Sequence, residues 1–194
     1  MRPTWPRPSS WPPTVDERAV ECVRAWADGD DLIGILGSSS FHHPCSAAFC
    51  FQLGYALARR AKPVRLVTGG VTGIPEAVTV GFLHACSASE GVLHLVPPGY
   101  PHPAQGDVVE VGPTMVDRRE VLAHVARAYV CIEGGPGTAH EVRMARDREA
   151  LVVPVGWTGG VAAVEGGASD EPADLLVEAR QVAESLMRRP STDA

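Results

Sequence analysis

The sequence CIEGGPGTAHE, residues 131–141, contains a glycine-rich turn between a strand and a helix. An apolar run at 128–132 leads into the turn and is typical of a buried strand, while residues 141–145 have helical spacing. Glycines let the backbone approach a ligand, and the first amides of a helix, at the positive end of its dipole, attract an anion. The turn therefore predicts either an anion-binding loop or a tight connection that binds nothing.

Strands and helices alternate along the chain on both sides of this turn. We expect strands at 32–36, 64–67, 91–96, 107–111, 128–132 and 151–155, and helices at 15–27, 44–60, 75–85, 114–127, 137–148 and 173–188. The strands are apolar throughout rather than alternating, which indicates a parallel sheet covered on both faces. The prediction is a single Rossmann-like α/β domain over residues 14–188, with a mainly parallel sheet and helices on both faces.

Three segments are expected to lie outside this regular pattern or at its limits. Residues 1–13 carry five prolines and two tryptophans, which predicts a disordered proline-rich tail, and residues 189–194 are expected to be a flexible C-terminus. The Thr14-x-x-Glu17 pattern predicts a capping box at the start of the first helix. Residues 156–170 contain five glycines, which predicts a mobile loop.

Composition limits the classes of function. The chain of 194 residues is 45% hydrophobic and 21% charged, as globular proteins are, and it has no apolar run near the roughly 18 residues of a membrane span. A formal charge of −6 argues against nucleic-acid binding, so any anion site must be local. The five cysteines form no C-x-x-C pair, which favours a reducing compartment. We expect a cytoplasmic protein, although the first fifteen residues lack an acid and leave an organellar address open.

Two other small-residue loops follow predicted strands. The first contains Gly37, Ser38 and Ser39, and the second runs from Thr68 to Gly73 with glycines at 69, 70 and 73. Ligands of open parallel sheets bind at the carboxyl ends of strands, where these two loops and the turn at Gly134 all lie. Each loop alone has an ordinary explanation as a chain reversal. Three at one edge favour a shared binding site.

Arg118 and Glu141 are the candidate catalytic residues, and each also has a structural explanation. Arg118 falls on the apolar stripe of the predicted helix 114–127, so it needs a buried anionic partner, either a ligand or another side chain. Arg119 is expected on the surface or as a secondary ligand contact. Thr138 and Glu141 form a T-x-x-E pattern, which a capping box would explain without function. Glu141 can equally serve as a base or stabilise developing positive charge.

Other catalytic chemistries have little support in the sequence. The segment His42-His43-Pro44-Cys45 could supply metal ligands, but no second ligand cluster has suitable spacing, so we expect no metal site. Neither a G-x-S-x-G elbow nor a Walker sequence occurs, which argues against a serine hydrolase and a P-loop NTPase. The only lysine, Lys62, lies in a helix-breaking Lys-Pro pair, which argues against a pyridoxal-phosphate decarboxylase.

These motifs together resemble the LOG-like, or SLOG, Rossmann family, whose members often carry the label lysine-decarboxylase-like. The resemblance covers residues 31–155 and rests on Gly134-Gly135-x-Gly137-Thr138-x-x-Glu141, on Met115-x-x-Arg118 and on the loops at Gly37 and Gly69. It implies homodimers or larger homo-oligomers and a small-molecule ligand, either a nucleotide or another phosphorylated heterocycle. It implies no cofactor.

Two branches of the family match. One comprises phosphoribohydrolases of the cytokinin-riboside-monophosphate type, which cleave nucleoside 5'-monophosphates into base and ribose 5-phosphate. Carried over, this branch implies that Arg118 and Glu141 are the catalytic pair. It further implies a phosphate held by the loop Gly134, Gly135, Gly137 and Thr138, with help from the glycine turn at 69, 70 and 73. The other branch is the molybdenum-cofactor carrier protein, which is similar in the segment 135–141 and binds its ligand without turnover.

One departure from the LOG pattern bears on the ligand. Glu133 replaces the proline that usually begins Pro-Gly-Gly. A carboxylate there, if it faced a bound phosphate, would weaken anion binding or change the class of ligand.

Overall fold

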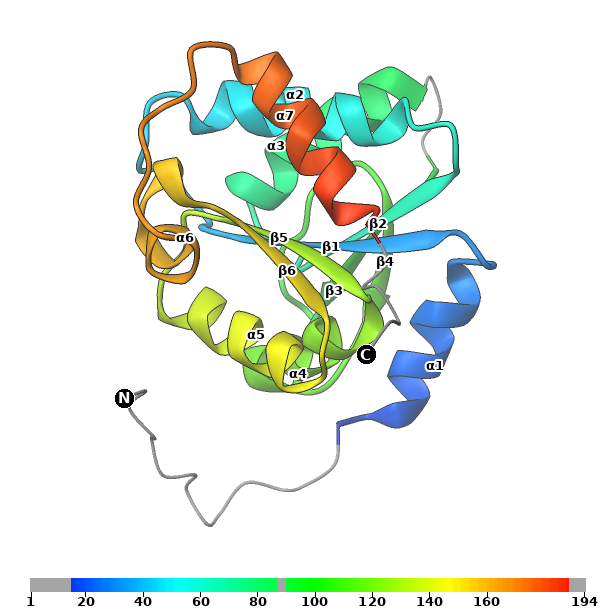
Figure 1. The fold of residues 1–194 in the computed structure, drawn as a ribbon. Helices are drawn as coiled ribbons and strands as arrows, with labels where there is room; N and C mark the ends of the chain where they lie inside the picture. Colours follow the sequence, from blue (N-terminus) through cyan, green and yellow to red (C-terminus); the bar gives the residue numbers. More distant parts are fainter. Residues whose placement is uncertain (1–14, 87–89, 189–194) are drawn as a thin grey trace, which may run out of the picture.

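The computed structural model describes residues 15–86 and 90–188, which form a sheet between two layers of helices (Figure 1). The elements in chain order are α1 (Glu17–Trp26), β1 (Asp31–Gly37), α2 (Ser46–Ala58), β2 (Val64–Thr68), α3 (Ile74–Cys86), β3 (Val92–Val96), β4 (Asp107–Glu110), α4 (Met115–Val125), β5 (Ala128–Ile132), α5 (Pro136–Asp147), β6 (Leu151–Val155), the 3-10 helix η1 (Gly156–Thr158), α6 (Gly160–Gly166) and α7 (Leu175–Leu186). The sheet order is β4-β3-β2-β1-β5-β6, with all neighbours parallel. The predicted Rossmann-like α/β fold is confirmed.

Helices cover both faces of the sheet, which is why the strands are apolar throughout. Figure 1 shows α2, α3 and α7 on one face and α1, α4 and α5 on the other. All residues of β3 and β5 are buried, whereas β4, at one edge, is largely exposed. The buried apolar side chains accordingly form two clusters, one on each side of the sheet.

Glycines allow close packing at the centre of the fold. A Cβ atom on Gly54 of α2 would lie 2.0 Å from the carbonyl oxygen of Val78 in α3, so these two helices touch backbone to backbone. In β1, a Cβ atom on Gly34 would lie 2.1 Å from the ring of Tyr129 in β5. The missing side chain of Gly34 therefore makes room for the buried tyrosine.

The region 156–170 differs from the prediction of a mobile loop. It contains η1 and α6, and the amides of Val161 and Ala162 donate to the carbonyls of Gly134 and Glu133 at 3.0 and 2.9 Å. Trp157 is buried at 7% exposure. The glycines in this region lie at the ends of two short helices, and α6 donates hydrogen bonds to the turn after β5.

The predictions for the two ends of the chain fall mostly outside the described residues. Asp16 caps α1 by accepting a hydrogen bond from the amide of Ala19 at 3.0 Å, whereas Thr14, the predicted cap, lies outside the described residues. The predicted tail at 1–13 and the predicted flexible C-terminus at 189–194 also lie outside them. Within 15–86 and 90–188, no helix has both the length and the apolar character needed to cross a membrane.

Candidate functional site

A cavity of about 290 Å³ lies at the carboxyl edge of the sheet, between the loop after β1, helix α4 and the N-terminus of α5. Nine residues singled out from the sequence line it: Gly37, Ser38, Ser39, Arg118, Arg119, Gly135, Gly137, Thr138 and Glu141. Five further lining residues were not predicted: Ser40, His42, Val71, Met115 and Pro136. Each of them neighbours a predicted residue in the chain or belongs to a quoted motif, and this proximity is the signal that could have identified them.

Arg118 and Glu141 meet in the wall of this cavity. Nη1 of Arg118 lies 2.8 Å from Oε1 of Glu141, and the two residues are 4% and 5% exposed. Nε of Arg118 is also buried and has no hydrogen-bond partner among the described residues. Burial raises the pKa of the Glu141 carboxyl, and the guanidinium offsets only part of that effect. The pair thus places an arginine and a less acidic carboxyl at one point of the cavity.

Helix α5 begins so that its N-terminus borders the cavity. Gly135 is the N-cap and Pro136 the first helical residue, so Thr138 and Glu141 lie inside the helix. The capping-box interpretation of these two residues is therefore wrong. The hydroxyl of Thr138 instead donates to the carbonyl of Gly37 at 3.4 Å, which ties α5 to the loop after β1. The first amides of α5 have no partner within the helix and are suited to bind an anion.

Two glycines of the predicted site make room for arginines. A Cβ atom on Gly69 would lie 2.3 Å from Nη1 of Arg118, and one on Gly137 would lie 2.8 Å from Nη2 of Arg119. Each guanidinium therefore lies against a backbone without a side chain. Gly69 does not line the cavity, but it fixes where Arg118 can be.

The remaining glycines of the prediction hold the loops together rather than line the cavity. Gly73 has a φ of 75° and lies so close to Ser39 that a Cβ atom would be 2.5 Å from the serine backbone. Gly134 has a φ of 100°, and its amide donates to Oγ of Ser38 at 2.9 Å. Gly70, with a φ of 63°, donates its amide to Oγ1 of Thr68 at 3.0 Å. The two glycine turns therefore position the loops that line the cavity without lining it at these three glycines.

Comparison with known proteins identifies the family. A model of the SLOG cluster4 family matches residues 31–186. The chain belongs to the SLOG family. No curated protein matches this SLOG chain. The family match at 31–186 extends through α6 and to the end of α7, so it includes the region after β6 that the glycine-rich motifs do not reach.

Solved structures share the fold of this SLOG chain at low identity. The X-ray structure of TM1055, a structural-genomics target, has a TM-score of 0.62 and 23% identity over 79% of this chain and 98% of its own. The molybdenum cofactor carrier protein of Chlamydomonas reinhardtii has a TM-score of 0.58 and 20% identity, with 82% and 99% covered. DNA processing protein A of Helicobacter pylori, described with a single-stranded DNA binding mode, has a TM-score of 0.57 and 14% identity, with 84% of each chain covered. At these identities the likeness establishes the fold alone.

Glu133, which departs from the LOG pattern, is turned toward the loop after β1. Its carboxylate accepts hydrogen bonds from the amide of His42 at 3.0 and 3.1 Å and from the amide of His43 at 2.9 Å. Burial alone would raise the pKa of this carboxyl, but hydrogen bonds to the carboxylate, including those from His43 and His42, outweigh burial and hold the pKa below its ordinary value. Glu133 does not line the cavity. The carboxylate therefore faces the amides of the loop after β1, and its effect on a bound phosphate stays a prediction.

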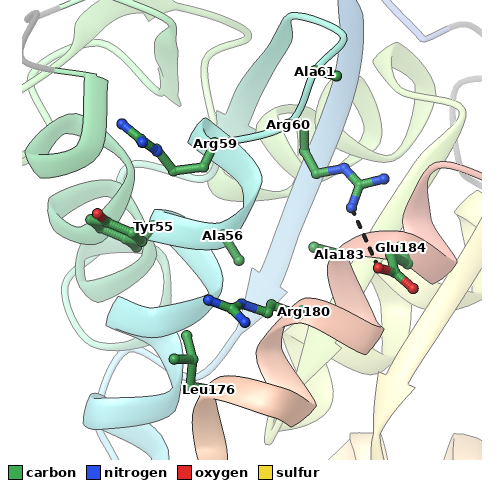
Figure 2. Close-up of a pocket in the computed structure, with 9 residues that line it drawn as sticks. All are labelled: Tyr55, Ala56, Arg59, Arg60, Ala61, Leu176, Arg180, Ala183 and Glu184. Carbon is green, nitrogen blue, oxygen red and sulfur yellow. Dashed lines mark ion pairs between the residues drawn. The ribbon is translucent and has the colours of Figure 1, made fainter.

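A second, larger cavity of about 570 Å³ lies between α2 and α7 (Figure 2). Figure 2 shows Arg60 directed toward Glu184, and these two side chains approach to 3.9 Å. Arg59 to Ala61 line this cavity and come shortly before β2, so it lies toward the amino ends of the strands. Ligands of this fold bind at the opposite edge. The smaller cavity, with its helix N-terminus and buried pair, is the candidate functional site.

Proposed function

We propose that this SLOG protein hydrolyses the N-glycosidic bond of a nucleoside 5'-monophosphate, releasing the base and ribose 5-phosphate. One observation carries the proposal: the buried pair of Arg118 and Glu141 lines a cavity beside the N-terminus of α5. Desolvation offsets most of the attraction within a buried ion pair, so such a pair is weak evidence for stability. Its place in a cavity wall favours a role toward a ligand.

In this proposal the phosphate of the ligand lies at the N-terminus of α5. The first amides of the helix donate to phosphate oxygens, and Arg119, which lies against Gly137, supplies a positive charge. The hydroxyls of Ser38 and Ser39 extend the set of donors from the facing loop. These groups give a chain of net charge −6 a local anion site.

Glu141 and Arg118 then act at the ribose. As the bond between C1' and the base nitrogen breaks, positive charge develops on the ribosyl carbon, which the carboxylate of Glu141 stabilises. Water supplies the hydroxyl that bonds to C1', and its proton passes through Glu141 toward the departing base nitrogen. A carboxyl with a raised pKa suits this transfer, and Arg118 holds it in position.

A second function has a specific observation in its favour. Glu141 is already bound to Arg118, and a carboxylate engaged in this way is a poorer base than a free one. The chain would then bind a phosphorylated heterocycle, such as the molybdenum cofactor, without converting it. A protein named as a carrier of that cofactor shares the fold.

The test is to incubate purified protein with a panel of nucleoside 5'-monophosphates, including N6-substituted adenosine forms, and to follow free base by mass spectrometry. We expect release from at least one member, reduced about 10²- to 10⁴-fold in Glu141→Gln. Glu21→Gln, at an exposed position on α1, is the matched control and should not change release. Binding without release from any nucleotide would contradict hydrolysis and support the carrier.

A double variant separates function from stability. Removing one partner of a buried pair leaves the other uncompensated and destabilises by about 3–5 kcal/mol, whereas replacing both by apolar residues is often neutral. Arg118→Met with Glu141→Leu should therefore fold with nearly normal stability and lose ligand binding, measured by calorimetry. Retained affinity for the ligand in that folded variant would show that the pair is structural.

A further inference from the structure

Three metal-ligating side chains gather outside the candidate site. His43 and Cys45 belong to the loop between β1 and α2, and Glu171 belongs to the segment between α6 and α7. Sγ of Cys45 lies 3.0 Å from Oε1 of Glu171, and Nε2 of His43 lies 3.6 Å from Oε2 of Glu171. One ligand atom from each residue lies within 4.8 Å of the other two.

These separations suit a single small ion. Ligand atoms about 2.0 to 2.3 Å from a tetrahedral Zn²⁺ are roughly 3.3 to 3.7 Å from one another. The observed 3.6 Å lies within that range and the observed 3.0 Å lies just below it, so small side-chain rotations suffice to place the three groups around an ion. The lack of a second ligand cluster with suitable spacing in the sequence was the ground for expecting no metal, whereas the fold brings Glu171 to His43 and Cys45 from a distant part of the chain.

We propose that His43, Cys45 and Glu171 bind one Zn²⁺ ion, with water in the fourth position. A thiolate, an imidazole and a carboxylate are the three donors that Zn²⁺ accepts in proteins, whereas Mg²⁺ and Ca²⁺ require oxygen donors. The side chains of His43 and Glu171 are 24% and 45% exposed, which leaves a route for the ion and a place for the water.

The loop that carries two of the three ligands is held in place by other contacts. The amides of His42 and His43 are bound by the buried carboxylate of Glu133. The ring of His43 also packs edge-on against Trp157, with 5.1 Å between ring centroids. These supports fix the loop that carries two of the ligands before any ion binds, which reduces the entropy that binding must overcome.

Binding of the ion would replace hydrogen bonds that Cys45 and His43 form in the structure. The thiol of Cys45 donates to Glu171, and Nδ1 of His43 accepts a 3.3 Å hydrogen bond from the amide of Cys45. Binding transfers the thiol proton to solvent, and the imidazole proton moves from Nε2 to Nδ1, which gives up that long hydrogen bond. The ion then ties the segment before α7 to the loop after β1. Because His42 of that loop lines the candidate site, the ion would hold one wall of the cavity in place.

The test uses untagged, full-length protein treated with a chelator and then titrated. Calorimetry with Zn²⁺ should give one ion per chain, and Co²⁺ should give the near-ultraviolet charge-transfer absorption of a single thiolate. Cys45→Ser should remove this absorption, and Cys45→Ser and Glu171→Gln should each weaken Zn²⁺ binding by about 100-fold or more, since even loss of an outer-shell partner costs 10- to 100-fold.

Cys22→Ser is the matched control, because Cys22 is a free, exposed cysteine on α1. It should leave both the stoichiometry and the absorption unchanged. Circular dichroism checks that each variant is folded. Absence of stoichiometric binding in the folded wild-type protein would overturn the proposal, as would unchanged binding in Cys45→Ser. The outcome does not depend on the proposed hydrolysis, since no nucleotide enters the measurement.

Discussion

Replacing Glu133 by Gln should destabilise the protein at neutral pH and have little effect in acid. The carboxylate of Glu133 binds two backbone amides, those of His42 and His43, at distances between 2.9 and 3.1 Å. Hydrogen bonds to a charged group contribute about 1.5–3 kcal/mol each, against about 1 kcal/mol for neutral ones. Because the amide oxygen of Gln can still accept both bonds, only the contribution of the charge is lost. The expected loss is about 1–3 kcal/mol.

The pH dependence follows from the lowered pKa of Glu133 in the folded protein. A carboxyl whose folded pKa is below its unfolded value stabilises the fold above the unfolded pKa, and this stability is lost as pH falls through the folded pKa. The ordinary value is 4.5, so the difference between wild type and Glu133→Gln should be full at neutral pH and shrink below that value. Protonated Glu133 then resembles Gln.

The assay is urea denaturation at neutral pH and at several acidic values. Glu149→Gln is the matched control, because Glu149 also has a positive φ, 63° against 54° for Glu133, but is exposed, and among the described residues its carboxylate has no hydrogen bond or ion pair. It should leave the free energy of unfolding within about 0.5 kcal/mol of wild type. Equal stability of Glu133→Gln and wild type at neutral pH would refute the role of the carboxylate, and so would a deficit that does not diminish in acid.

Three further substitutions test other parts of the structure. Gly137→Ala should displace the guanidinium of Arg119 and weaken a phosphate-bearing ligand about tenfold or more by calorimetry, as loss of a charge-assisted bond does, while stability stays unchanged or rises; normal affinity would contradict the placement of Arg119. Tyr129→Phe removes a buried hydroxyl that bonds two backbone groups at 2.8 and 3.0 Å, so urea denaturation should show a loss of about 1–3 kcal/mol, and a neutral result would argue against these bonds. Gly54→Ala should lower the free energy of unfolding by about 3 kcal/mol, because its Cβ atom would lie 2.0 Å from the carbonyl oxygen of Val78; a stable variant would mean that α2 and α3 can separate freely.

Local pattern was enough to predict the fold and to bring most of the candidate site together. The apolar runs that became β1, β2, β3 and β5 are buried between helices, so each sequence pattern reports the environment of its strand. Parallel strands in turn place the loops after β1 and β5 at one edge. Arg118 was predicted to point inward, and it does, because it lies on the buried stripe of α4.

What the sequence did not predict depends on contacts between distant residues. The direction of Glu133 is set by amides some 90 positions earlier, and nothing near it in the sequence signals them. Glu171 meets Cys45 only because the segment before α7 passes over the loop after β1. The capping-box pattern of Thr138 misled because Pro136 starts α5 earlier, and proline is favourable at the first position of a helix.

The position of β1 in the sheet has a consequence for how the chain is made. Among the described strands β1 comes first in the chain, but it lies between β2 and β5, and its Ile33 pairs with Ala128. While residues 64–127 are being synthesised, the nascent chain can pair β1 with β2, but the other side of β1 has no partner. An open, apolar strand edge is a template for association with other chains. A chain that ends before Ala128 therefore leaves one edge of β1 open to association, whereas a chain that includes β5 covers that edge.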